Sequence, residues 1–161
     1  MSIVRQFLES DQWLSDEEMP NRFSRLIDNE DLFYCELGDD CRVVLGYVQD
    51  EMDYLTFKGR IATEEERQII FHAAVFCDMS LEDCNKNSEI KVWMQANGWK
   101  KHDMYNFEKT ISGLRLTVSE MDPNVFIIRL TDGDIFDDAL FQGKVYEPRE
   151  FELILKCITC G

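Results

Sequence analysis

Apolar residues recur at positions i, i+3 and i+4 in three short stretches of the chain, which places them on one face of a helix. The three predicted helical faces are Val4, Phe7 and Leu8; Ile90, Trp93 and Met94; and Phe151, Ile154, Leu155 and Ile158. Gly98 is placed to end the second helix, and Pro148 suits the first turn of the third. Thr63 and Glu66 form a capping-box pattern, which predicts the start of a fourth helix.

Between the predicted helices the period changes to that of strands. Leu114, Leu116 and Val118 alternate with polar residues, which is typical of a half-buried strand. The runs "CRVVLGYV" and "VFIIRL" are β-branched and short, and they predict well-buried strands. A third strand in each half is expected to run into the closing helix. The segments Arg22–Ile27 and Tyr105–Ile111 are expected to add a helical turn or two.

Turn residues separate these predicted strands. The run "TDGD" (Thr131–Asp134) is a good hairpin turn, and "GDD" before Cys41 is a second candidate.

Two segments of the chain recur in the same order. "FKGRIATEEERQIIF" (Phe57–Phe71) matches "FQGKVYEPREFELIL" (Phe141–Leu155) at an offset of 84 residues. "VRQFLESDQW" (Val4–Trp13) matches "IKVWMQANGW" (Ile90–Trp99) at an offset of 86. Two matches at nearly the same offset predict an internal duplication.

The sequence therefore predicts an α+β protein of two tandem α-β-β-β-α modules that arose by duplication. The first module spans residues 1–84 and the second spans residues 85–161. Each antiparallel sheet is expected to be covered by helices on one face. The second module would shelter the face that remains, so that both pack as one compact unit.

Charge is placed unevenly along the chain. The formal net charge is −15, of which residues 1–84 carry −13 and residues 85–161 carry −2. Binding to nucleic acid or to an anionic membrane needs cationic groups, so we expect neither. An anionic surface attracts a basic partner. The residues predicted to bind it are the acids of the first module near turns and the helix start: Asp39, Asp40, Asp50, Glu51, Asp53, Glu64 and Glu65.

Motifs for chemistry are weak in this sequence. Cys157 and Cys160 form a C-x-x-C pair that would be half of a zinc site, but no second close pair of cysteines accompanies it. The acidic run Asp132–Asp138 lacks the glycine and glutamate of a calcium-binding EF-hand loop, and solvated turns explain it. No phosphate-binding loop or nucleophile motif occurs. We therefore predict no cofactor and no metal, with Cys157 and Cys160 as the minor metal candidates.

The function predicted from these observations is that of a non-enzymatic acidic protein. It would bind a basic protein and inhibit, neutralise or chaperone it, as immunity proteins, inhibitors and secretion chaperones do. One alternative is a nucleic-acid mimic that blocks a DNA- or RNA-binding enzyme. The other is a zinc- or thiol-dependent enzyme that combines the C-terminal cysteines with His72, Cys35 or Cys41. The start of the chain has no signal-peptide core, and no run approaches the ~18 apolar residues of a membrane span, so a cytoplasmic location is expected. Exposed strand edges would allow a homodimer.

Overall fold

The computed structural model describes residues 3–27, 31–74, 89–122, 124–131 and 139–159. Within these ranges the chain forms four helices and one antiparallel sheet of ten strands, so the predicted α+β class is confirmed. The acidic run Asp132–Asp138 and the turn predicted from Asp132 to Asp134 fall outside the described residues, as does Cys160.

The elements follow the same order in both halves of the chain. The helices are α1 (Ile3–Ser10), α2 (Glu64–Ala74), α4 (Glu89–Ala96) and α5 (Pro148–Thr159). The strands of the first half are β1 (Leu14–Ser15), β2 (Arg22–Ile27), β3 (Asp31–Leu37), β4 (Arg42–Gln49) and β5 (Met52–Arg60). Those of the second half are β6 (Lys100–Lys101), β7 (Asn106–Ile111), β8 (Leu114–Asp122), β9 (Val125–Leu130) and β10 (Ala139–Lys144). All four predicted helices are therefore present.

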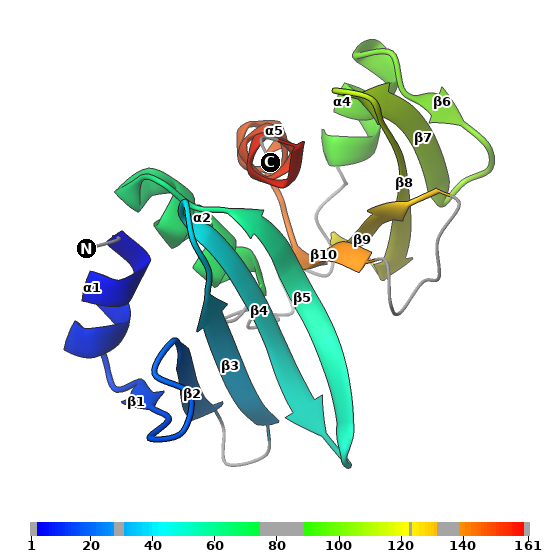
Figure 1. Cartoon of the computed structure of the whole chain (residues 1–161). Helices are drawn as coiled ribbons and strands as arrows, with labels where there is room; N and C mark the ends of the chain where they lie inside the picture. The colour runs from blue at the N-terminus through cyan, green and yellow to red at the C-terminus, as the bar shows by residue number, and fades with distance from the viewer. Residues whose placement is uncertain (1–2, 28–30, 75–88, 123, 132–138, 160–161) are drawn as a thin grey trace.

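The two halves join edge to edge in one continuous sheet (Figure 1). Its strand order is β1-β2-β3-β4-β5-β10-β9-β8-β7-β6, with the last strand of each half at the centre. Phe57 of β5 and Phe141 of β10 are paired there. The expectation of separate sheets, in which one module shelters the open face of the other, is wrong. Pairing β5 with β10 instead removes two strand edges that would otherwise be left unpaired.

The number of strands in each half was also predicted wrongly. Each half has four strands of six or more residues and one strand of two residues, rather than three strands. The segments expected to be helical turns are strands β2 and β7. Phe23, Leu26 and Ile27 recur at i, i+3 and i+4 and so imitate a helical face, but β2 pairs with β3 along its whole length. Pairing along the whole strand therefore overrides the local pattern.

The two closing helices cross over the centre of the sheet, and each contacts a strand of the opposite half. Helix α2 packs on β10, and α5 packs on β5. A Cβ atom at Gly59 would lie 2.6 Å from the carbonyl oxygen of Cys157, and one at Gly143 would collide with the carbonyl oxygen of Ala73. The Phe-x-Gly element that occurs twice in the sequence therefore lets a helix backbone lie directly on the strand.

The buried apolar side chains of both halves form one cluster between the sheet and the helices. Its largest fully buried members are Phe57, Phe71, Phe107, Phe126, Phe141 and Phe151. Since this core runs across the central strand pair without interruption, the halves pack as one unit.

Helix α2 begins with the predicted capping box. The Thr63 hydroxyl accepts a hydrogen bond from the Glu66 N–H at 3.2 Å, and the Glu66 carboxylate accepts from the N–H groups of Ala62 and Thr63 at 2.9 and 3.1 Å. Burial acts to raise the pKa of Glu66, but these hydrogen bonds and the nearby Lys156 outweigh it and leave that pKa below its usual value. The box thus fixes the point at which the chain leaves β5 and enters α2.

Removing the capping hydroxyl should destabilise the protein measurably. We expect Thr63→Ala to lower the free energy of unfolding by about 1 kcal/mol, because the Glu66 N–H loses its partner. Urea unfolding measures this change. Thr63→Ser keeps the hydroxyl and is the matched control, which should unfold close to the wild type. Equal losses in the two variants would contradict a role for the hydroxyl.

Candidate interaction surface

The seven carboxylates predicted to bind a partner form two groups, which lie near opposite ends of strand β4 (Arg42–Gln49). Asp39 and Asp40 occupy the turn between β3 and β4, while Asp50 and Glu51 occupy the turn between β4 and β5. Strand β4 has eight residues, so the two turns are separated by roughly 25 Å at about 3.4 Å per residue. The structure therefore divides these residues into two groups: Asp39, Asp40, Glu64 and Glu65 at one end, and Asp50, Glu51 and Asp53 at the other.

Three members of the first group are bound to arginines of the same chain. Asp40 forms an ion pair with Arg60 at 3.0 Å, and Glu64 forms one with Arg67 at 2.6 Å. A further ion pair joins Glu65 to Arg149 of α5. The hydrogen bonds from Arg67 also lower the pKa of Glu64. Much of the charge at this end of the sheet is thus neutralised within the protein.

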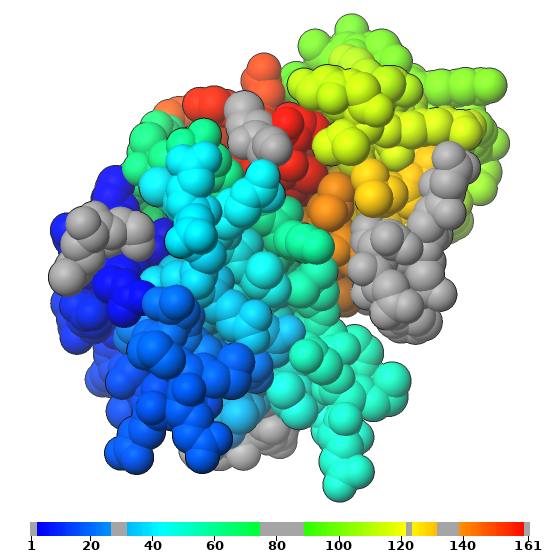
Figure 2. Space-filling view, viewed as in Figure 1, coloured from blue at the N-terminus to red at the C-terminus, as the bar shows by residue number. Residues whose placement is uncertain are grey.

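The second group lies on the projecting hairpin of β4 and β5 (Figure 2). Asp50 and Glu51 have φ angles of 51° and 66°, and Gln49 pairs with Met52 across them. This is a two-residue turn of the I′ type, in which asparagine and glycine are the favoured residues. A left-handed backbone costs energy for a residue with a side chain, so the acidic pair is held there at the expense of stability.

Aromatic contacts hold this hairpin in place. The rings of Tyr47 and Tyr54 stack across β4 and β5 with their centres 5.0 Å apart. On the other face of the sheet, the Tyr34 hydroxyl donates to the Asp53 carboxylate at 2.6 Å. Burial and this hydrogen bond raise the pKa of Tyr34, so its hydroxyl keeps the proton that it donates. Asp53 is exposed, and its hydrogen bond with Tyr34 fixes its orientation.

An apolar row leads across the open sheet face to the hairpin. Leu26 of β2 pairs with Leu32 of β3, which pairs with Val48 of β4, which in turn pairs with Asp53 of β5. Residues that pair directly in a sheet point to the same face. Leu26 is 55% exposed and Leu32 is 41% exposed. We call Leu26, Leu32, Val48, Asp50, Glu51 and Asp53 the hairpin surface.

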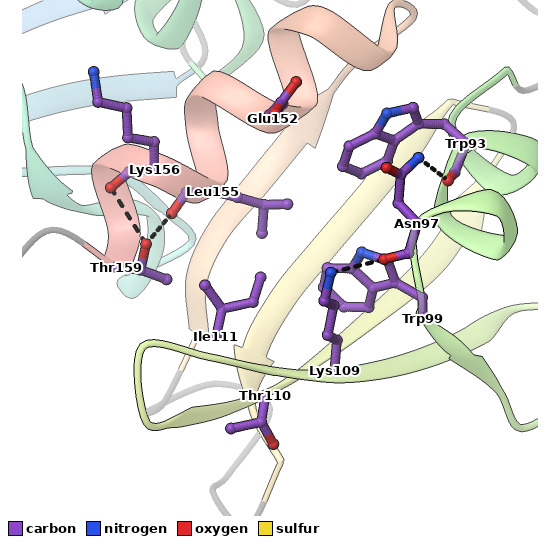
Figure 3. Close-up of a pocket in the computed structure, with 10 residues that line it drawn as sticks. All are labelled: Trp93, Asn97, Trp99, Lys109, Thr110, Ile111, Glu152, Leu155, Lys156 and Thr159. Carbon is purple, nitrogen blue, oxygen red and sulfur yellow. Dashed lines mark hydrogen bonds between the residues drawn. The ribbon is translucent and has the colours of Figure 1, made fainter.

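A groove lies in the other half, between α4, β7 and α5 (Figure 3). This groove has a volume of about 410 Å³. Trp93 and Trp99 form one wall, and Leu155 and Ile111 face them from α5 and β7. The Lys109 ammonium lies at the tryptophan side, where it donates to the Asn97 carbonyl oxygen at 2.7 Å.

The cysteines give little support to a metal or thiol site. Cys157 is buried in α5, where its backbone lies against Gly59. Cys35 is buried in β3. Burial raises the pKa of the Cys35 thiol, which disfavours the reactive thiolate. Cys41 is partly exposed in a turn, and His72 is exposed on α2. In the part of the chain that the structure describes, no three metal-ligating side chains come together.

Reasoning from the sequence missed the apolar row and the groove. Leu26 lies in β2, which was expected to be helical, and Leu32 of β3 pairs with it. The row that these two residues form could therefore not be predicted. The groove does have a signal in the matching segments of the sequence, because Phe71 matches Leu155 and Asp11 matches Asn97. The first difference removes a ring beside the tryptophans, and the second removes a negative charge.

No protein-family model, curated protein or solved structure matches this chain. Among the described helices, none combines the length and the apolar character needed to cross a membrane.

Proposed function

We propose that this chain is a non-enzymatic acidic interaction protein, which binds a basic protein partner through the hairpin surface and so inhibits, neutralises or chaperones it. The observation that supports this proposal most directly is the exposed apolar row that ends at the carboxylates of the projecting turn. A partner that carries lysine or arginine beside apolar side chains would match both parts of this surface.

Each part of the hairpin surface would contribute differently to binding. Leu26 and Leu32 would lose contact with water when covered, and burial of apolar area contributes about 25 cal/mol per Å². The carboxylates of Asp50, Glu51 and Asp53 would accelerate association with a cationic partner and set its orientation. The net charge of −15 would add long-range attraction toward the same partner. A cytoplasmic location remains part of this proposal.

We also propose that residues 1–84 and 85–161 are copies of one ancestral module. Two contacts join positions that lie 84 residues apart, which supports this proposal. Phe57 pairs with Phe141, and Glu65 forms an ion pair with Arg149. The irregularity of strand pairing beside Phe57 recurs beside Phe141. In this view the hairpin surface belongs to the first copy.

The binding proposal can be tested with two variants of equal charge. A Leu/Lys amphipathic helical peptide serves as the probe, with a scrambled peptide of the same composition for comparison. We expect Asp50→Asn with Glu51→Gln to weaken binding of the amphipathic peptide about tenfold, or about 1.4 kcal/mol, since the charge contacts with the lysines are lost. Fluorescence anisotropy measures the dissociation constants at low and moderate salt.

The matched control is Asp39→Asn with Asp40→Asn, which changes the net charge equally at the other end of the sheet. We expect it to weaken binding only about twofold, through the long-range field that salt screens. Leu32→Ser should also weaken binding of the amphipathic peptide while it leaves the scrambled peptide unaffected. Equal losses for both acidic pairs, or equal binding of both peptides, would reject the hairpin surface as the binding site.

A further inference from the structure

The groove beside Trp93 and Trp99 differs in filling from the equivalent place in the first half. There, the Phe71 ring packs edge-on against Phe7 at 5.3 Å and against Trp13 at 6.1 Å between ring centres. The residue 84 positions later is Leu155, which has no ring to place between the tryptophans.

The tryptophans of the second half are held by a different residue. Trp93 and Trp99 contact Phe151, one helical turn before Leu155, at 5.9 and 6.4 Å between ring centres. Because Phe151 packs against the tryptophans one turn away, the space beside Leu155 stays open. Leu155 and Ile111 face the indole rings across this groove (Figure 3). Its volume of about 410 Å³ lies in the range of sites that hold small organic molecules.

The charge beside this groove differs between the halves as well. In the first half, Arg25 of β2 forms an ion pair with the Asp11 carboxylate at 3.0 Å. The equivalent cation in the second half is Lys109, and the residue that corresponds to Asp11 is Asn97. Lys109 donates instead to the main-chain carbonyl oxygen of Asn97 at 2.7 Å, and the side-chain amide of Asn97 donates to the main-chain carbonyl oxygen of Trp93 at 2.8 Å. An ammonium has three donors, and the hydrogen bonds among the described residues use one of them.

The other charged residues of the groove lie on α5. Lys156 extends away from the tryptophans (Figure 3), and its ammonium lies 3.7 Å from the Glu66 carboxylate. Glu152 lines the groove from the same helix. Repulsion from Glu152 would direct the anionic group of a ligand toward Lys109.

We propose that this groove binds a small organic anion that has a flat apolar body and one carboxylate or sulfonate. The apolar body would lie between the indole rings and Leu155, where aromatic groups bury large area and favour stacked or edge-on contacts. The anionic group would accept a charge-assisted hydrogen bond from Lys109. This binding site is separate from the hairpin surface and does not depend on it.

A pair of fluorescent probes can separate the two parts of this proposal. 8-Anilinonaphthalene-1-sulfonate carries the anionic group, and N-phenyl-1-naphthylamine has the same aromatic body without it. We expect saturable binding of the sulfonate with one site per chain. We expect Lys109→Gln to weaken sulfonate binding about tenfold, since the charge-assisted hydrogen bond from the ammonium to the sulfonate is lost. Binding of the neutral amine should change little.

Three further variants test the site itself. Asn97→Asp restores the carboxylate of the first half and should weaken binding of the sulfonate but not of the amine. Leu155→Phe restores the ring and should reduce binding of both probes, while circular dichroism confirms that the variant is folded. Lys101→Gln removes an exposed lysine of β6, outside the groove, and is the control of equal charge. Sulfonate binding that is unchanged by Lys109→Gln and Asn97→Asp, or absent from the wild type, would overturn the proposal.

Discussion

Phe141→Ala is expected to lower the free energy of unfolding by about 4 kcal/mol, within the range of 3–5 kcal/mol for deletion of a buried ring. Phe141 is fully buried at the centre of the sheet and pairs with Phe57 across the junction of the two halves. A void there removes contacts on both sides of the junction, so neither half can close it by moving alone. Urea unfolding, followed by circular dichroism, measures the loss.

An exposed apolar residue provides the comparison for this deletion. Met104 is 63% exposed, and Met104→Ala should change the free energy of unfolding by no more than about 0.5 kcal/mol. A loss below about 1 kcal/mol in Phe141→Ala would show that the junction contributes less than its burial implies.

Gly143→Ala is the second change expected to have a large effect. The added Cβ would overlap the carbonyl oxygen of Ala73, which is backbone and cannot rotate away. Helix α2 must then move off β10, and we expect the free energy of unfolding to fall by about 3 kcal/mol, the upper part of the usual range for overpacking. For a chain of this length, the melting temperature should fall by roughly 6–12 °C.

Gly38→Ala is the matched control for this substitution. A Cβ at Gly38 would lie 3.5 Å from its nearest neighbour, the Cβ of Arg42, which is an ordinary contact. We therefore expect a change in melting temperature of no more than about 2 °C. Equal melting temperatures in the Gly143 and Gly38 variants would mean that the helix does not lie against the strand as described.

Local patterns in the sequence predict much of this fold. The i, i+3, i+4 stripes identified α1, α4 and α5, and the capping box located the start of α2 within one residue. The runs around Val43 and Ile127 were correctly read as strands β4 and β9. These signals are short-range, because they depend on a helix face, a cap or a run of β-branched residues.

Long-range arrangement was not predicted correctly. Strand β2 has helical spacing of apolar residues and becomes a strand because β3 offers it a full set of backbone partners. The halves join because Phe57 of β5 pairs with Phe141 of β10, 84 positions later. The repeated Phe-x-Gly element did not indicate that its two copies would pair with each other.

The candidate surfaces show the same division between local and long-range information. Acidic turn residues can be read from the sequence, and Asp50 and Glu51 do occupy an exposed turn. That Arg149 neutralises Glu65 could not be read, since these residues come from different halves and meet only where α2 and α5 cross. The groove needed a comparison of the two halves at equivalent positions.

The crossing of the closing helices sets which positions can vary. Where the Ala73 and Cys157 backbones rest on Gly143 and Gly59, no side chain larger than hydrogen fits, so substitution in one half is constrained by a helix from the other. Phe71 and Leu155 lie on the same two helices, but Phe71 packs against Phe7 and Trp13 of the first half, and Leu155 lines the groove of the second half. Close contact between helix and strand therefore restricts substitution along the centre of the sheet, while positions that face only their own half can differ between the two halves.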